Sequence, residues 1–142
     1  MAKLRSDFPI EAFNQQAAEY LPGYLGIEIT SSSESTVAGR MNIKKLHLAP
    51  HDFLHAASIV ALADTTCGYA TLAHLPEGAK SFTTIELKSN HIGTLREGNI
   101  TCVATAQHLG RNTQVWDAVV RDEITGRKLA LFRCTQMILW PK

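Results

Sequence analysis

The chain has 142 residues, 45% of them hydrophobic and 19% charged, and its formal net charge is +1. This length suits one domain over residues 1–142 around one core, and no block of like charge marks a nucleic-acid or membrane-surface partner. Neither a bilayer-spanning apolar run nor the apolar segment of a signal peptide is visible, so we expect a cytoplasmic protein.

The first predicted element is a helix over residues 8–21, with Asp7 as its N-cap. Phe13, Ala17 and Leu21 recur at intervals of four, so one face of this helix can pack against a core. The Pro-Gly pair that follows is typical of a helix end.

Two strands and a long helix come next. Aromatic and β-branched residues indicate strands at 24–30 and 36–43, and serines indicate the turn at 31–35. An irregular stretch at 47–54 leads into residues 55–75, whose length and alanine content favour a helix. Small or apolar residues cover nearly its whole circumference, so we expect it to be buried on most sides.

Four strand-like segments complete the chain, with breaks at glycines between them. Long strands with short turns predict an antiparallel meander. One buried helix must then lie against one curved sheet, which is an α+β layout. The predicted strands lie at 81–92, 98–109, 113–123 and 128–140.

The cysteines and histidines carry no metal or disulfide pattern. Cys67, Cys102 and Cys134 are far apart in the sequence and form no CxxC pair, so we expect three buried, reduced thiols. The histidines lack metal-ligand spacing, and no metal site is predicted.

Asp64 is the only acidic or permanently charged side chain between His55 and Leu75. A carboxylate on a buried helix is costly unless it is paired or hydrated. One interpretation is a structural contact to backbone amides or a buried histidine, and the other is a general base or nucleophile that lines a cleft.

The start of the same helix offers a second group. The first amides of a helix are unsatisfied and lie at its positive dipole end, so the Ala56 N–H could polarise a carbonyl as an oxyanion hole does. His55 is either an ordinary first-turn residue or part of this site. Ala56 and Asp64 are eight residues apart, about 12 Å along a helix axis. Both can therefore act on one carbonyl only if they come from two chains.

These residues resemble a known family. The segments LHAAS (54–58) and LADT (62–65) are similar to the HGG…LA(D/E) signature of hotdog-fold acyl-CoA thioesterases. The segments KSNH (88–91), LREG (95–98) and HLGRNT (108–113) resemble the 4-hydroxybenzoyl-CoA and dihydroxynaphthoyl-CoA branch, and the aspartate resembles the phenylacetate-pathway branch. The resemblance implies a hotdog fold, a curved antiparallel β-sheet wrapped around one long central α-helix.

The resemblance also implies a function and a set of site residues. It implies hydrolysis of an acyl-CoA, aryl-CoA included, by a homodimer or homotetramer that needs no cofactor beyond the coenzyme A of its substrate. The implied catalytic residues are Asp64, Thr65, His55 and Ala56. The implied coenzyme A contacts are Asn90, His91, Arg96, Arg111, Asn112 and Thr113.

Two departures from the family pattern keep other functions open. Ala56 and Ala57 replace the two glycines, and Ala49 stands where the aryl-CoA branch often has a glutamine. A non-catalytic acyl-CoA-binding protein is therefore one alternative. A hotdog hydroxyacyl dehydratase is another, although dehydratases space their histidine and acid differently.

Overall fold

The computed structural model describes residues 3–142. These residues form three α-helices, one 3₁₀ turn and six strands. The helical elements are α1 (Ile10–Ala17), α2 (Leu21–Leu25), η1 (Lys45–His47) and α3 (Ala56–Ala73). The strands are β1 (Ile27–Ser33), β2 (Thr36–Asn42), β3 (Ser81–His91), β4 (Asn99–Leu109), β5 (Thr113–Asp122) and β6 (Lys128–Leu139).

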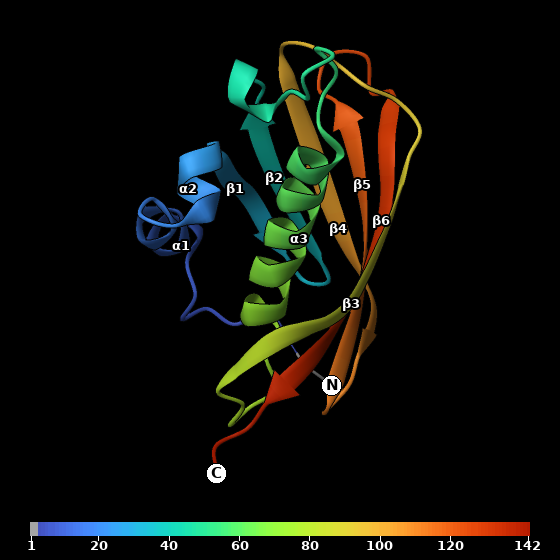
Figure 1. Ribbon diagram of the computed structural model, residues 1–142. Helices are drawn as coiled ribbons and strands as arrows, with labels where there is room; N and C mark the ends of the chain where they lie inside the picture. The colour runs from blue at the N-terminus through green and yellow to red at the C-terminus, as the bar shows by residue number, and fades with distance from the viewer. Residues whose placement is uncertain (1–2) are drawn as a thin grey trace.

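The six strands form one antiparallel sheet that curves around α3 (Figure 1). The buried residues of α3, among them Ile59, Leu62 and Cys67, join Trp116 and the other inward-facing strand residues in one hydrophobic core. The helix approaches β2 closely because Gly39 has no side chain: a Cβ there would lie 2.5 Å from the Thr66 hydroxyl oxygen. This arrangement confirms the predicted hotdog fold.

The strand order corrects the predicted meander. The sheet runs β1-β2-β4-β5-β6-β3, so only β4, β5 and β6 follow one another as a meander. The chain leaves β2, crosses the concave face of the sheet as α3, and returns as β3 on the far edge, where β3 pairs with β6. The predicted bounds of the last four strands are confirmed to within one residue.

The predicted helix over 8–21 is wrong in its extent. It divides into α1 and α2, because Pro22 lies in the first turn of a second helix, a position that proline favours. The N-cap of α1 is Pro9, and Asp7 pairs with Arg5 instead. Leu21 is 64% exposed rather than packed.

The first strand is also shifted from its predicted position at 24–30, whereas the second, predicted at 36–43, is confirmed as β2 to within one residue. Residue 24 belongs to α2, and β1 begins only at Ile27. The serines at 31–33 extend β1 instead of forming the turn. The turn is shorter, and Ser35 adopts the left-handed conformation that a tight reversal needs, with φ 65°.

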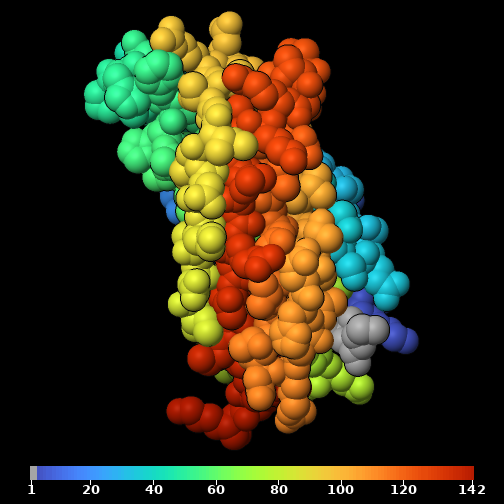
Figure 2. Space-filling model, turned by 90° about the vertical axis from the view of Figure 1, so that its right-hand side faces the viewer, coloured from blue at the N-terminus to red at the C-terminus, as the bar shows by residue number. Residues whose placement is uncertain are grey.

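The two edges of the sheet differ. At the β1 edge, the Asn14 side-chain amide donates to the Ile29 carbonyl and its oxygen accepts from the Ile29 N–H, both at 2.9 Å. Asn14 therefore occupies the backbone N–H and C=O of Ile29, one of the edge positions to which another strand would bind. At the other edge, β3 pairs with β6 on one side only, and it borders the sheet in the space-filling view (Figure 2).

All three cysteines are free and buried, as predicted. The fold brings them together beneath α3, where a hydrogen bond with Cys134, and then burial, raise the pKa of the Cys67 thiol. Burial raises the pKa of the Cys102 thiol to about 12, so the thiols of Cys67 and Cys102 stay neutral and unreactive. Among the described residues, none of the helices combines the length and the apolar character that a membrane span requires.

Candidate active site

The start of α3 presents one free backbone amide. His55 is the N-cap, and its Nδ1 accepts a hydrogen bond of 2.9 Å from the Ala57 N–H. The Ser58 N–H donates to the His55 carbonyl. Ala56 is an exposed residue, and its N–H has no acceptor within residues 3–142. Because His55 occupies the Ala57 amide, Ala56 is the donor left for a ligand, and its φ is negative as the oxyanion role requires.

A loop holds this helix end in place. The His47 carbonyl accepts hydrogen bonds from the His55 N–H at 2.9 Å and from the Ser58 hydroxyl at 2.8 Å. His47 is itself fixed, because its Nδ1 accepts from the Lys44 N–H and its Nε2 donates to the Leu25 carbonyl. The donor site at Ala56 is therefore preorganised.

Asp64 lies two turns further along α3, on a face of the helix that the sheet leaves partly uncovered. Ala61, Asp64, Thr65 and Gly68 share this face, and each is only half-buried. The Asp64 Oδ1 is shielded from solvent and has no hydrogen-bond partner in the described chain. Burial raises the pKa of this carboxyl above its usual range. The structural interpretation, a carboxylate paired within its own chain, is therefore wrong for Oδ1.

The raised pKa predicts the pH dependence of any reaction in which Asp64 is the base. Such a base is active when ionised, so kcat should fall as pH decreases through the raised pKa, at higher pH than for an exposed aspartate. A pH–rate profile measures this limb. A profile that stays flat down to the pKa of an exposed carboxyl would contradict the assignment.

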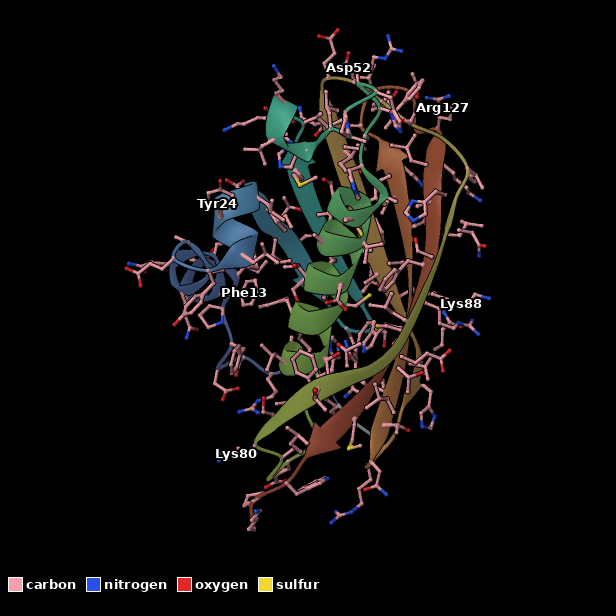
Figure 3. The ribbon with its side chains drawn as sticks, in the orientation of Figure 1. Phe13, Tyr24, Asp52, Lys80, Lys88 and Arg127 are labelled. Carbon is pink, nitrogen blue, oxygen red and sulfur yellow. The ribbon has the colours of Figure 1, made fainter. Side chains whose placement is uncertain are left out.

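Strand β3 places the predicted coenzyme A contacts on two faces. Its register with β6 pairs His91 with Ala130 and Asn90 with Leu131. Ala130 is buried beneath the helix and Leu131 is exposed, and paired residues project to the same side of a sheet. His91 therefore faces α3, whereas Asn90 lines a shallow hollow on the outer face. Lys88 shares the outer face with Asn90 and projects away from α3 (Figure 3).

The predicted arginines lie at opposite ends of the sheet. Arg96 follows β3 and lies 4.9 Å from the Phe53 ring, beside the start of α3. Arg111 lies in the β4–β5 turn and is 4.3 Å from the Trp140 ring, near the end of α3. Asp52 and Arg127 mark the first end and Lys80 the second (Figure 3). One chain therefore does not bring the predicted coenzyme A contacts together.

Asn112 and Thr113 build the turn that presents Arg111. The Asn112 carbonyl accepts from the Ile138 N–H, and the Thr113 carbonyl accepts from the Gly110 N–H, both at 2.9 Å. A Cβ at Gly110 would lie 2.5 Å from the His108 ring, so a larger residue there would displace that side chain. The two residues thus have backbone roles that shape the arginine's position.

Two polar groups near these sites were missed by the sequence argument. The Ser89 hydroxyl and the Trp140 Nε1 are both shielded from solvent without a hydrogen-bond partner among residues 3–142. Strand alternation could have found Ser89, since it shares the inner face of β3 with His91. Among residues 3–142, no cluster of three or more histidine, cysteine or acidic side chains is arranged to hold a metal ion.

Comparison with known proteins decides the family. The model of the thioesterase superfamily matches residues 51–128, more than half of the chain and the segment that contains α3 and β3. The chain belongs to the thioesterase superfamily. This thioesterase is 34% identical over 119 residues to a Haemophilus influenzae protein named as an esterase, covering 84% of this chain and 86% of the relative.

Further relatives agree with this membership and with the fold. The 1,4-dihydroxy-2-naphthoyl-CoA hydrolase of Escherichia coli is 29% identical over 133 residues, covering 92% of this chain and 94% of the relative. The crystal structure of a thioesterase from Haemophilus influenzae superposes with a TM-score of 0.89 at 30% identity, covering 98% of this chain and 95% of that structure. The chain is thus a thioester hydrolase.

Proposed function

We propose that this thioesterase hydrolyses an acyl-CoA, aryl-CoA included, to the free acid and coenzyme A. The observation that carries the proposal is the Asp64 carboxyl, whose Oδ1 is shielded yet unpartnered on the uncovered face of α3. The Ala56 amide of a second subunit is the proposed oxyanion donor. Thr65 and His55 complete the site, His55 as the cap that fixes the helix end.

Two reaction routes fit this assignment. As general base, Asp64 takes a proton from water, whose oxygen forms a bond to the thioester carbonyl carbon while the C–S bond breaks and the thiolate leaves. As nucleophile, the carboxylate displaces the thiolate to form an anhydride, which water then hydrolyses. Either route builds negative charge on the carbonyl oxygen, which the free Ala56 N–H would stabilise. Neither route needs a cofactor.

The proposed site is shared between two chains. Ala56 and Asp64 are about 12 Å apart along one helix axis, too far to act on one carbonyl. The free edge of β3 offers the pairing surface, since Asn14 blocks the edge at β1. Ile85 and Leu87 on β3 are 53% and 42% exposed, and a second sheet would cover them. We therefore propose a homodimer through antiparallel β3–β3 pairing, with a tetramer as a pair of such dimers.

Antiparallel pairing would also unite the coenzyme A contacts. It sets the Ser81 end of one β3 beside the His91 end of the other. Arg111 of one subunit then approaches the end of the dimer where His91 and Arg96 of its partner lie. The cytoplasm, which keeps thiols reduced, is the proposed location, and the three free cysteines agree with it.

Hydrolysis is tested with a panel of acyl-CoAs and a thiol reagent that reports the released coenzyme A. The protein's own thiols are buried, so the background should be low. Turnover of at least one substrate supports the proposal. Binding of free coenzyme A without any turnover would favour the non-catalytic alternative, which gains support from Ala49, because its methyl group cannot orient a carbonyl.

Replacing Arg111 by alanine should chiefly raise KM for acyl-CoA. The Arg111 guanidinium makes no ion pair with the described residues, so it is available to a phosphate, which arginine binds well. A lost phosphate contact weakens ground state and transition state alike. Steady-state kinetics separate the two parameters. An unchanged KM, or a large loss of kcat alone, would contradict a nucleotide contact at Arg111.

A further inference from the structure

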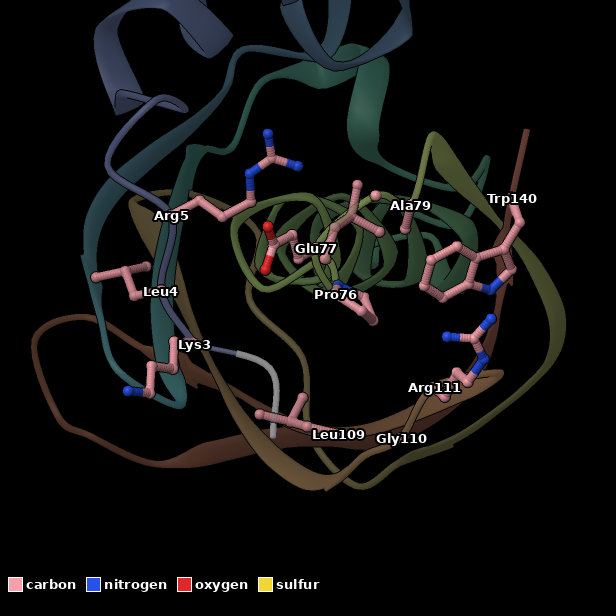
Figure 4. Close-up of a pocket in the computed structure, with 12 residues that line it drawn as sticks. Lys3, Leu4, Arg5, Pro76, Glu77, Ala79, Leu109, Gly110, Arg111 and Trp140 are labelled. Atoms are coloured by element: carbon pink, nitrogen blue, oxygen red, sulfur yellow. The ribbon is translucent and has the colours of Figure 1, made fainter.

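An open pocket of about 920 Å³ lies beyond the end of α3, at the far end of the molecule from Ala56. Its walls include Arg111, Trp140, Lys3, Arg5 and Glu77 (Figure 4). Arg5 is already neutralised by Asp7. Arg111 has no carboxylate partner in the described chain, so this cation remains available to an anion in the pocket.

Trp140 is the side chain that holds this cation. The guanidinium carbon of Arg111 lies 4.3 Å from the centre of the indole ring, a close cation–π contact. The turn that follows α3 passes close to this ring, since a Cβ built on Gly78 would lie 3.6 Å from its Cζ3 atom. Arginine has many rotamers, and an aromatic face beside the guanidinium favours those that keep the contact, at the wall of the pocket that both residues line.

The indole also has a donor that nothing in its own chain uses. The Trp140 Nε1 is shielded from solvent and finds no acceptor in residues 3–142, although indole N–H is a donor only and usually finds an acceptor when buried. Figure 4 shows this nitrogen on the side of the ring nearest Arg111. An unused N–H beside an unpaired guanidinium favours a group that accepts from both, such as a phosphate.

We propose that Trp140 is a positioning residue for the phosphates of the acyl-CoA nucleotide. Its ring orients the Arg111 guanidinium, and its N–H donates to the same phosphate. The inference rests on the proposed function, and it adds a specificity: substrates with the nucleotide are favoured over the same thioester on pantetheine alone, which lacks the nucleotide phosphates.

The experiment compares one acyl group carried by coenzyme A and by pantetheine. For Trp140→Ala, KM for the acyl-CoA should rise about tenfold, the scale of a cation–π contact with one charge-assisted hydrogen bond. Trp140→Phe keeps an aromatic face without the N–H, so its KM for the acyl-CoA should lie between those of Trp140→Ala and the wild type. With the pantetheine thioester, kcat/KM of all three proteins should be equal, and kcat for the acyl-CoA should be unchanged.

Two controls separate positioning from packing. Tyr24→Ala removes an aromatic ring that is 76% exposed on α2 and should change neither substrate's kinetics. In an Arg111→Ala background, Trp140→Ala should add little beyond the lost N–H contact, because the ring acts through the arginine. Calorimetric titration with free coenzyme A, which has no acyl group, should show affinity falling from the wild type to Trp140→Phe to Trp140→Ala.

Distinct outcomes would overturn the inference. Equal loss with both substrates would assign Trp140 to the stability of the fold alone. Equal KM for wild type and Trp140→Ala with acyl-CoA would remove its role while leaving hydrolysis intact. If no thioester is hydrolysed, the proposed function fails, and the coenzyme A titrations of the wild type and the two Trp140 variants still decide whether the indole contributes to binding.

Discussion

Asp64→Asn should lower kcat for acyl-CoA hydrolysis by at least about two orders of magnitude, the usual scale of a positioned acid–base group. Asparagine keeps the size of the side chain and removes its ability to accept a proton or to attack a carbonyl carbon. The substrate KM should change little, because the variant keeps the shape of the cleft. Release of coenzyme A thiol, followed with saturating substrate, measures the loss.

The fold should survive this substitution. Burial raises the pKa of Asp64 above its unfolded value, so the folded state binds the proton more tightly, and the ionised carboxylate weakens the fold as pH rises through that pKa. At neutral pH the uncharged asparagine should therefore melt no lower than the wild type. Glu28→Gln, at an exposed acid on β1, is the matched control. Near-wild-type turnover by Asp64→Asn would refute the assignment.

Mixing two inactive variants should restore activity if the site is shared. Ala56→Pro removes the proposed oxyanion N–H and should cost about 10² to 10³ in kcat. Proline suits the first position of a helix, and His55 before it already has φ −65° and ψ 133°, an angle pair that proline tolerates in its predecessor. The variant should therefore fold, and Ala56→Ser, which keeps the N–H, should stay active.

The expected rescue is quantitative. A dimer of one Asp64→Asn chain and one Ala56→Pro chain has one site with both defects and one site with none. Equal amounts that exchange freely should therefore recover about a quarter of wild-type activity, since half of the dimers are mixed and each has one working site. Subunit exchange is verified by mass spectrometry of the intact dimers. Verified exchange without recovery, or an active monomer in sedimentation, would exclude a shared site.

The strong periodic elements of this fold could be predicted from the sequence, and the ambiguous ones could not. The alanine-rich helix and the last four strands have clear lengths and glycine breaks. The first 33 residues misled the prediction because Pro22 suits a helix start as well as a helix end, and because serine is tolerated in the exposed edge strand β1. The position of β3 beside β6 is a long-range pairing that local sequence does not encode.

The candidate site, too, could be predicted only in part. Asp64 was recognisable as a lone charge on an apolar helix. That its Oδ1 has no hydrogen-bond partner in the described chain depends on the tertiary fold and could not be predicted. The amide of Ala56 was singled out by helix-end geometry, but the reason that Ala57 is unavailable lies in the orientation of the His55 ring. Trp140 had no local signal, because its contact with Arg111 joins residues that are far apart in the chain.

The Asn14 carboxamide would limit how far the proposed self-association through the sheet can go. A sheet with two open edges can add chains at both ends and grow into a fibre. Pairing through β3 would leave only β1 edges at the two ends of the joined sheet, and at each of them Asn14 already occupies Ile29. Strand addition would then be hindered after two chains, and this side chain would help keep the enzyme a discrete particle rather than a polymer.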